Sequence, residues 1–238
     1  MGRTRAVFFD VDFTLIYPGP TFQAQGYRRF CERHGLAIDE STFDRAVAAA
    51  SVVLDRVQDH IYDPQLFVDY TMHVIRHMGG DGPGLASCAR EMYDEWASCQ
   101  HFFLYEEVPD VLRELRRRGL AIGIISNSHR CLASFQSHFE LDGLISAAVS
   151  SSEHGFMKPH PSIFQAALSL VGVPAAEAVM VGDSLTQDID GARRLGMSGV
   201  LVVRSGRAPA DDAGVPVITS LRELPRHLTL AGAADMGH

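Results

Sequence analysis

Long hydrophobic runs are missing from this 238-residue sequence. No apolar stretch approaches the roughly 18 residues that a membrane-spanning helix requires, so we expect no membrane partner. Basic residues are also scarce, because 21 Lys and Arg stand against 29 Asp and Glu and give a formal net charge of −8. A general nucleic-acid binder presents an excess of basic residues, so we expect no nucleic-acid partner either. A phosphorylated small molecule is compatible with this charge, since a bound cation reverses its local sign.

Cysteine is the second scarce residue type. The four cysteines are Cys31, Cys88, Cys99 and Cys131. They include no C-x-x-C pair and match no zinc-site spacing, which predicts free thiols in a reducing compartment. Asp10 and Asp12 interrupt the first apolar stretch, which argues against a secretory signal. We therefore expect a cytoplasmic protein.

Apolar runs alternate with helical segments through much of the chain. Buried strands are expected at 5–10, 120–125, 145–149, 178–182, 200–203 and 216–218, and helices at 109–118, 130–138, 161–171, 186–195 and from 221. Repeated strand–helix units place their strands in parallel, so the pattern predicts an α/β fold with a doubly wound parallel sheet.

The segment after the first strand has helical periodicity only. Apolar residues recur every three or four positions from Phe43 to Val57, from Phe67 to Met78 and from Leu85 to Trp96. With a weaker helix at 21–36, the pattern predicts about four helices. We expect two domains: an α/β core of residues 1–17 and 104–238, and an inserted all-helical domain at 18–103.

Polar residues stand at or beyond the ends of the expected strands. They are Asp10 with Asp12, Ser126 with Asn127, and Asp183 with Asp188, while Lys158 lies in a further loop. Ligands of open parallel sheets bind beyond the carboxyl ends of the strands, so these side chains are expected to converge, although one such acid alone is often only a helix cap. Converging carboxylates require a hard cation, and oxygen ligands suit Mg²⁺. An aspartate nucleophile, an ammonium group and hydroxyl donors together suit phosphoryl transfer.

Four segments resemble the motifs of one enzyme family. Asp10-Val-Asp-Phe-Thr-Leu15 is similar to the Asp-x-Asp-x-Thr motif of the haloacid dehalogenase-like (HAD) hydrolases. The second, third and fourth motifs are resembled, in family order, by Ile124–Ser128, Met157–Phe164 and Val181–Asp188. The helical insert lies where the family has its C1 cap. The resemblance implies a Rossmann-like HAD core and a cap that closes over it through hinges near 16–20 and 100–106.

The resemblance also implies roles for the residues of the first two motifs. Asp10 would be the nucleophile and a Mg²⁺ ligand, and Asp12 would be the general acid/base, with its backbone carbonyl on the metal. Thr14 would support the loop at the substrate, and Ser126 with Asn127 would bind the phosphoryl oxygens.

The third and fourth motifs complete the implied site. Lys158 would neutralise charge on the nucleophile and the phosphoryl group, and Asp183 would complete the metal site. Asp188 would hold Lys158 or the waters of the metal, with Ser184 as a weaker outer residue.

Position 13 departs from the family's commonest form, which has glycine where this chain has Phe13. A bulky side chain there is expected to restrict the size of the substrate. Phe13, Tyr17 and His129 follow motif residues closely, so we expect them to line the pocket.

Together these residues favour an enzyme, a Mg²⁺-dependent phosphatase that hydrolyses a small phosphomonoester through an aspartyl-phosphate. A haloacid dehalogenase needs no acid for its leaving group, so Asp12 argues against that alternative. A phosphomutase uses the same core and stays an alternative. A phospho-acceptor or binding module of the receiver type has neither the helical insert nor the second acid. The sequence leaves open the physiological substrate and the choice between monomer and homodimer.

Overall fold

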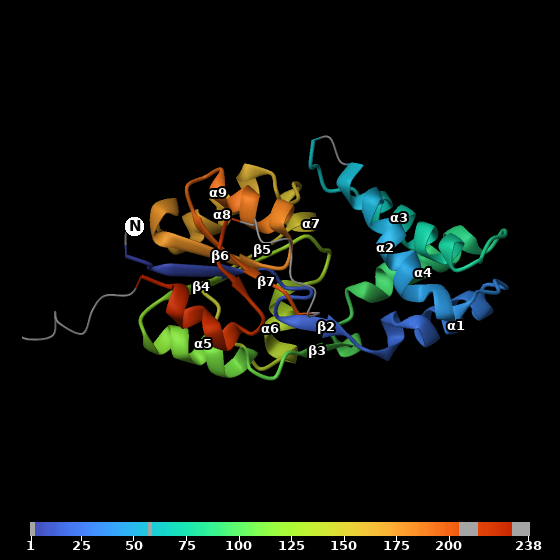
Figure 1. The fold of residues 1–238 in the computed structure, drawn as a ribbon, viewed down its shortest axis with the longest axis horizontal. Helices are drawn as coiled ribbons and strands as arrows, with labels where there is room; N and C mark the ends of the chain where they lie inside the picture. The colour runs from blue at the N-terminus through green and yellow to red at the C-terminus, as the bar shows by residue number, and fades with distance from the viewer. Residues whose placement is uncertain (1–2, 57–58, 205–213, 230–238) are drawn as a thin grey trace, which may run out of the picture. The chain divides into compact units, whose positions relative to one another are not determined.

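The structure is a computed structural model that describes residues 3–56, 59–204 and 214–229. The chain divides into two compact units, Met1–Tyr17 with Leu104–His238 (unit 1) and Pro18–Phe103 (unit 2) (Figure 1). The boundary falls inside two short strands, β2 (Ile16–Pro18) and β3 (Phe102–Leu104), which pair with each other. The sequence pattern does not indicate these strands, because three residues are too few to show a periodicity.

Within the described residues, unit 1 is built on a six-stranded parallel sheet. In spatial order its strands are β5 (Ala147–Ser150), β4 (Ala121–Ser126), β1 (Ala6–Phe9), β6 (Ala178–Gly182), β7 (Ser198–Val202) and β8 (Val217–Ile218). The predicted fold class, α/β with a doubly wound parallel sheet, is confirmed. The chain adds strands first on one side of β1 and then on the other. Ligands of open α/β sheets bind at such a reversal, beyond the carboxyl ends of the strands.

Helices cover both faces of this sheet. Figure 1 shows α8 (Pro161–Val171) and α9 (Gly191–Arg193) on one face, and α5 (Val108–Arg117) with the 3₁₀ helix η7 (Leu221–His227) on the other. Further helical segments in the described part of unit 1 are α6 (Leu132–His138), α7 (Ser151–His154), the 3₁₀ turn η5 (Ala175–Glu177) and the π-helical segment η6 (Leu185–Asp190).

The central strand β1 shows why the layers hold together. All four of its side chains, Ala6–Phe9, are fully buried, as expected for a strand covered on both faces. A Cβ atom on Gly123 of β4 would lie 2.3 Å from the Phe8 Cδ1 atom, so only glycine leaves room for that ring. Burying one such phenyl ring stabilises the fold by about 1.5–3 kcal/mol.

Two of the expected helices have other forms. The helix expected at 186–195 is the π-helical η6 followed by the short α9. The Ser184 Oγ atom caps η6 by accepting from the Gln187 backbone N at 3.1 Å. The helix expected from 221 is the 3₁₀ helix η7, because Pro225 within it lacks the N–H that an α-helix would use.

Unit 2 is mainly helical in its described part, as the periodicity predicts. Its α-helices are α1 (Ala24–Arg33), α2 (Phe43–Ala50), α3 (Pro64–His77) and α4 (Leu85–Trp96), with the 3₁₀ segments η1 (Pro20–Phe22), η2 (Glu40–Thr42), η3 (Ser51–Arg56) and η4 (Cys99–His101). The helix expected from Phe43 onward ends at Ala50 and continues as η3, and Val57, its expected last residue, lies outside the described residues. At the change, Ser51 Oγ donates to the Ala48 carbonyl at 2.8 Å and competes with the helical pattern. None of the helices in the described ranges has the length and apolar character of a membrane span.

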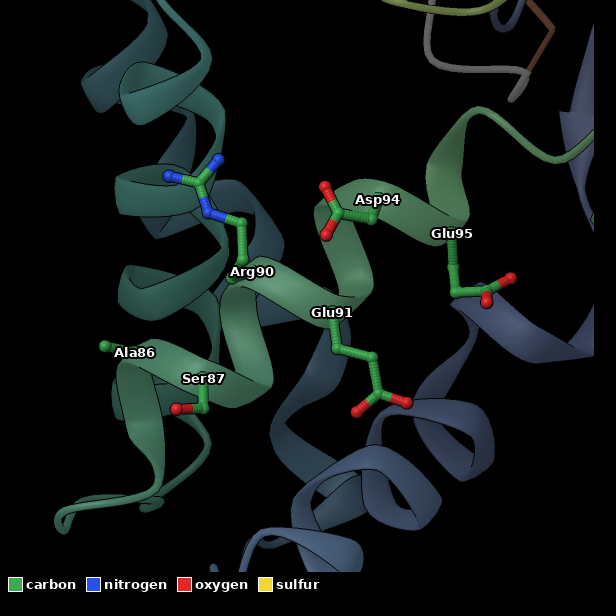
Figure 2. A pocket seen from close by; sticks show the side chains of 6 residues that line it. All are labelled: Ala86, Ser87, Arg90, Glu91, Asp94 and Glu95. Atoms are coloured by element: carbon green, nitrogen blue, oxygen red, sulfur yellow. The ribbon is translucent and has the colours of Figure 1, made fainter.

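Figure 2 shows a hollow on the surface of unit 2, lined by residues of α4 alone. Its lining residues are Ala86, Ser87, Arg90, Glu91, Asp94 and Glu95. Arg90 donates to Gln65, and Glu91 pairs with Arg33 and His34. Since Arg90 and Glu91 already have partners outside the lining, we assign no ligand to this hollow.

Glu107 and Arg204 form an ion pair that joins three segments of unit 1. The Glu107 Oε1 atom lies 2.5 Å from Arg204 Nη1 and 3.2 Å from the backbone N of Leu221. Arg204 Nη2 also donates to the Thr14 carbonyl at 2.7 Å. Burial alone would raise the pKa of Glu107, but the hydrogen bond and charge of Arg204 lower it below its usual value.

We expect a Glu107→Gln substitution to lower the free energy of unfolding by about 3 kcal/mol at neutral pH, because it leaves the Arg204 charge enclosed without its counter-ion. Urea titration measures the loss, and Glu106→Gln, at an exposed neighbour, is the matched control. The lowered pKa stabilises the wild type above the unfolded value of about 4.3, and this contribution is lost as the pH falls through the folded value. The two proteins should therefore converge in acid; a constant difference would contradict the assignment.

Candidate active site

Three neighbouring strands end at the same edge of the sheet and carry the predicted site residues. Phe9 of β1 pairs with β4 on one side and with Val181 of β6 on the other. The Asp10 backbone N donates to the Val181 carbonyl at 2.9 Å, so Asp10 directly follows β1. Ser126 is the last residue of β4, and Asp183 is the first after β6. The sheet therefore brings together residues that lie more than a hundred positions apart in the sequence.

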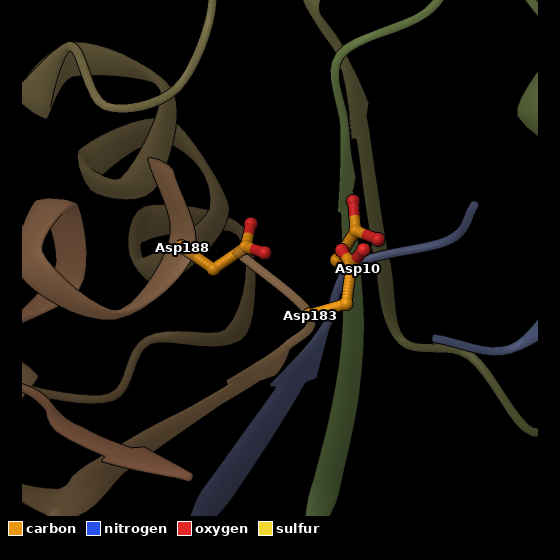
Figure 3. A group of neighbouring side chains, drawn as sticks. All are labelled: Asp10, Asp183 and Asp188. Atoms are coloured by element: carbon orange, nitrogen blue, oxygen red, sulfur yellow. The ribbon is translucent and has the colours of Figure 1, made fainter. Parts of the chain in front are cut away.

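Three carboxylates meet at this edge. Figure 3 shows the side chains of Asp10, Asp183 and Asp188 gathered at the ends of β1 and β6 and at η6. One oxygen from each lies within 4.8 Å of the other two, the only such group of three potential metal ligands found among the described residues. Asp10 and Asp188 are buried, whereas Asp183 is exposed. Asp188, which the sequence placed outside the metal ligands, belongs to the group, and the side chain of Asp12 does not.

Lys158 supplies the positive charge of this cluster. Its Nζ atom lies 2.5 Å from Asp10 Oδ1 and 2.7 Å from Asp188 Oδ1, and the side chain is buried. Asn127 fixes the backbone beneath it: Asn127 Nδ2 donates to the Lys158 carbonyl at 3.0 Å, and the Lys158 N–H donates to Asn127 Oδ1 at 2.7 Å. The amide of Asn127, predicted to bind phosphoryl oxygens, is thus engaged in holding the lysine.

Burial and crowding shift the charges of these groups. Burial raises the pKa of Asp10 to about 7, with Asp188 adding to the rise and Lys158 opposing it. The pKa of Asp183 is raised as well, by desolvation and by the charges of Asp10 and Asp188, although its residue surface is partly open to solvent. Burial alone would lower the pKa of Lys158, but its two carboxylate partners raise it above the usual value. The lysine is therefore an ammonium ion at neutral pH, and the cluster still lacks positive charge.

Asp188 is held in place from several directions. Its Oδ2 atom accepts from the Ser184 backbone N at 3.0 Å, while its Oδ1 atom accepts from Lys158. A Cβ atom on Gly182 would lie 2.2 Å from Asp188 Oδ2, so a side chain at position 182 would displace the carboxylate. Glycine at the end of β6 is thus required for the aspartate to reach the lysine. Ser184, predicted as an outer residue, acts here through its backbone N–H.

Asp12 lies apart from the three-carboxylate cluster and faces Arg130. Its Oδ2 and Oδ1 atoms lie 3.1 Å from Arg130 Nη1 and 3.1 Å from Arg130 Nη2, respectively. The sequence reasoning missed this arginine, although it follows Ser126 by only four residues in the loop after β4. The position of Arg130, so soon after the end of a predicted strand, is the sequence signal that could have indicated its role.

The remaining predicted residues differ in exposure, because Thr14 and Ser126 are buried whereas Phe13 and Tyr17 are exposed. Thr14 is fully buried, and within the described residues its hydroxyl has no hydrogen-bond partner, while Ser126 Oγ lies 2.8 Å from Ser128 Oγ. Phe13 is 43% exposed and has a backbone φ of 63°, a value that residues other than glycine rarely adopt. Tyr17 is 38% exposed and lies 4.9 Å, between ring centroids, from Tyr105. His129 is half-buried.

The cluster has the donor set of a hard divalent cation. Its three potential ligands are all carboxylates, and two of them share the ammonium group of Lys158. Mg²⁺ prefers oxygen ligands from one or two carboxylates together with water and phosphate. The residues present therefore fit this ion.

Comparison with known proteins shows that the chain is a hydrolase and gives its family. Residues 4–196 match the family model of haloacid dehalogenase-like hydrolases, and the chain belongs to that family. The mouse protein N-acylneuraminate-9-phosphatase is 30% identical over an alignment that covers 94% of each of the two chains. The predicted family and hydrolase class are confirmed, and the chain is of the phosphatase type.

Solved structures show the same fold. The structure of a HAD phosphatase from Thermococcus onnurineus is 24% identical, with a TM-score of 0.64, and covers 94% of this chain and 97% of its own. A 2-haloacid dehalogenase from Pseudomonas syringae pv. Tomato is also 24% identical, with a TM-score of 0.62 and the same coverage. Because one fold serves both kinds of protein, the reaction has to be argued from the site.

Proposed function

We propose that this HAD-family phosphatase depends on Mg²⁺ and hydrolyses a small phosphomonoester through an aspartyl-phosphate on Asp10. The observation that carries the proposal is the convergence of Asp10, Asp183 and Asp188 around the single ammonium group of Lys158. A dianionic phosphate is repelled by such carboxylates unless additional positive charge is present. Bound Mg²⁺ would supply that charge and neutralise negative charge on the phosphoryl oxygens.

Each residue of the site then has a defined task. Asp10 Oδ attacks phosphorus while the bond to the leaving oxygen breaks, and Asp12 gives that oxygen a proton. Asp12 then takes a proton from the water that attacks the phosphorus of the aspartyl-phosphate, so phosphate leaves and Asp10 is regenerated. Lys158 neutralises charge on Asp10 and the phosphoryl group, and Ser126 donates to a phosphoryl oxygen. Asp10 and Asp183, with the Asp12 carbonyl, would hold the metal, and Asp188 keeps Lys158 in place.

The domains and the setting of the enzyme are part of the proposal. Unit 1 is the catalytic core, and unit 2 is a cap of the C1 type that selects the substrate. The partner is a small phosphorylated metabolite, the compartment is the cytoplasm, and the protein acts as a monomer or a homodimer. The name of the mouse relative makes the 9-phosphate of an N-acylneuraminate the first substrate to assay.

The alternative reactions place different demands on Asp12. Haloacid dehalogenation releases a halide, which needs no proton, whereas this chain holds the Asp12 carboxylate against a buried arginine. Phosphoryl transfer makes use of such an acid, so the site favours the phosphatase over the dehalogenase. A phosphomutase uses the same groups, and an assay for phosphate release against isomerisation separates the two.

Metal removal tests the proposal directly. We expect EDTA to abolish hydrolysis of p-nitrophenyl phosphate and Mg²⁺ to restore it, because the carboxylate cluster then meets the substrate with Lys158 as its only cation. Inorganic phosphate release is measured after EDTA treatment, dialysis and addition of Mg²⁺. Circular dichroism on the same samples controls for unfolding. Full activity in EDTA would contradict the proposed mechanism.

A further inference from the structure

Arg130 brings a charged group into the interior of unit 1. Only 1% of its surface is exposed, although it stands in the short loop between β4 and α6. Charged side chains are almost never buried this fully without a partner of opposite charge. One such partner is Asp12, whose two carboxylate oxygens both lie close to the guanidinium group. The burial and the ion pair together indicate that this arginine is placed for Asp12.

Arg130 holds the Asp12 carboxylate through one hydrogen bond and one further ion-pair contact. Nη1 donates to Oδ2 at 3.1 Å, while Nη2 lies 3.1 Å from Oδ1, which accepts no hydrogen bond from any described residue. A guanidinium group close to both oxygens restricts the orientation of a carboxylate more than a charge close to one oxygen does. The Asp12 side chain keeps 19% of its surface exposed, whereas that of Arg130 has none. Because Asp12 Oδ1 accepts no hydrogen bond from the described residues, it keeps its acceptor sites for a proton.

The backbone beside Asp12 does not provide this support itself. The next residue, Phe13, has a positive φ of 63°, which is costly for a bulky residue. The turn is closed by the Phe13 N–H, which donates to the Ile16 carbonyl at 2.7 Å. These bonds shape the loop but do not hold the carboxylate of Asp12. The described contact that orients it comes from Arg130.

We propose that Arg130 is the positioning residue for Asp12, an inference that rests on the proposed function of Asp12 as general acid/base. The hydrogen bond and the ion pair hold the Asp12 carboxyl in the orientation from which it delivers a proton to the leaving oxygen and later accepts one from the attacking water. Arg130 keeps its own protons throughout and contacts neither the substrate nor the metal. Its loss should therefore slow the steps that need proton transfer and spare those that do not.

Two substrates of similar shape separate these steps. Phenyl phosphate and p-nitrophenyl phosphate differ by one nitro group, and p-nitrophenolate leaves without a proton far more readily than phenolate does. The kcat/KM value reports the steps up to departure of the leaving group. We expect Arg130→Lys and Arg130→Met to lower kcat/KM about tenfold or more for phenyl phosphate, and by less than about threefold for p-nitrophenyl phosphate, because a positioned acid contributes about 10²–10⁴-fold.

The ratio of the two kcat/KM values is the decisive quantity, since it does not depend on the fraction of folded enzyme. The matched control is Arg204→Lys, which alters another mostly buried arginine–carboxylate pair and should leave the ratio unchanged. In an Asp12→Asn background, Arg130→Met should not change the ratio further. An equal loss for both substrates, or additive effects in the double variant, would overturn the positioning role.

The outcomes also separate this inference from the proposed function. If Asp12→Asn itself leaves the ratio of kcat/KM values unchanged, the acid/base role of Asp12 fails, and the role of Arg130 fails with it. If Asp12→Asn changes the ratio and the two Arg130 variants do not, only the positioning role of Arg130 is wrong. Because Arg130→Lys keeps the charge, it provides the measurement should Arg130→Met fail to fold.

Discussion

An Asp10→Asn substitution should reduce hydrolysis of a phosphomonoester more than about 10³-fold, because a side-chain amide is a poor nucleophile toward phosphorus. The substitution keeps the size of the side chain that lies 2.5 Å from the Lys158 ammonium group. Acid-quenched wild-type enzyme should carry phosphate that hydroxylamine removes, as expected for an acyl phosphate. The variant should carry none. Steady-state kinetics and radiolabelled substrate measure both effects.

Asp190→Asn is the matched control for this experiment. Asp190 ends the same η6 segment that contains Asp188, but it is not part of the three-carboxylate cluster. Its substitution should change kcat by less than about twofold, as is usual for surface positions away from the chemistry. More than a tenth of wild-type activity in Asp10→Asn would exclude Asp10 as the nucleophile.

A Lys158→Met substitution should lower kcat by about 10²–10³-fold, the usual cost of removing one group that stabilises transition-state charge. It should also lower the free energy of unfolding by about 3 kcal/mol, because Asp10 and Asp188 lose their buried counter-ion. Because the pKa of Lys158 is raised, its stabilising contribution is fully present below the unfolded value of about 10.4 and is lost only as the pH rises through the folded value. Kinetics and urea titration at neutral pH measure the two losses.

The double variant Lys158→Met with Asp188→Asn tests where the instability comes from. Removing one of the two uncompensated carboxylates should restore part of the stability but none of the activity, because Asp10 still lacks its cation. Stability that falls further in the double variant would show that Asp188 stabilises the fold independently of the lysine.

Much of the fold follows from local sequence patterns. The strand around Phe8 and the strand around Met180 are short apolar runs that end at an acid, and both lie in the sheet as the pattern predicts. The boundaries of α8 (Pro161–Val171) agree with the prediction, because proline begins that helix and Gly172 ends it. Element forms that depend on one side chain were missed. Pro225 lacks a backbone N–H, and the Ser51 hydroxyl donates to a backbone carbonyl; apolar periodicity records neither effect.

The sequence predicts those parts of the site that depend only on where a strand ends. Asp10 and Asp183 meet because adjacent parallel strands end at one edge, and strand ends are readable from the sequence. Contacts made by long or turning side chains were not readable. Arg130 reaches Asp12 across 118 positions, and the Asn127 amide bonds to the backbone of Lys158. Such pairings depend on the tertiary arrangement of loops and leave no periodic signal in the sequence.

The identity of the residue at position 158 has a practical consequence, because it is the only lysine among all 238 residues. Isotopic labelling of lysine alone therefore introduces one NMR reporter, and its side-chain nitrogen lies between the carboxylates of Asp10 and Asp188. The chemical shift of that single nitrogen would follow the binding of ions and phosphate analogues in the unaltered protein, without any engineered probe.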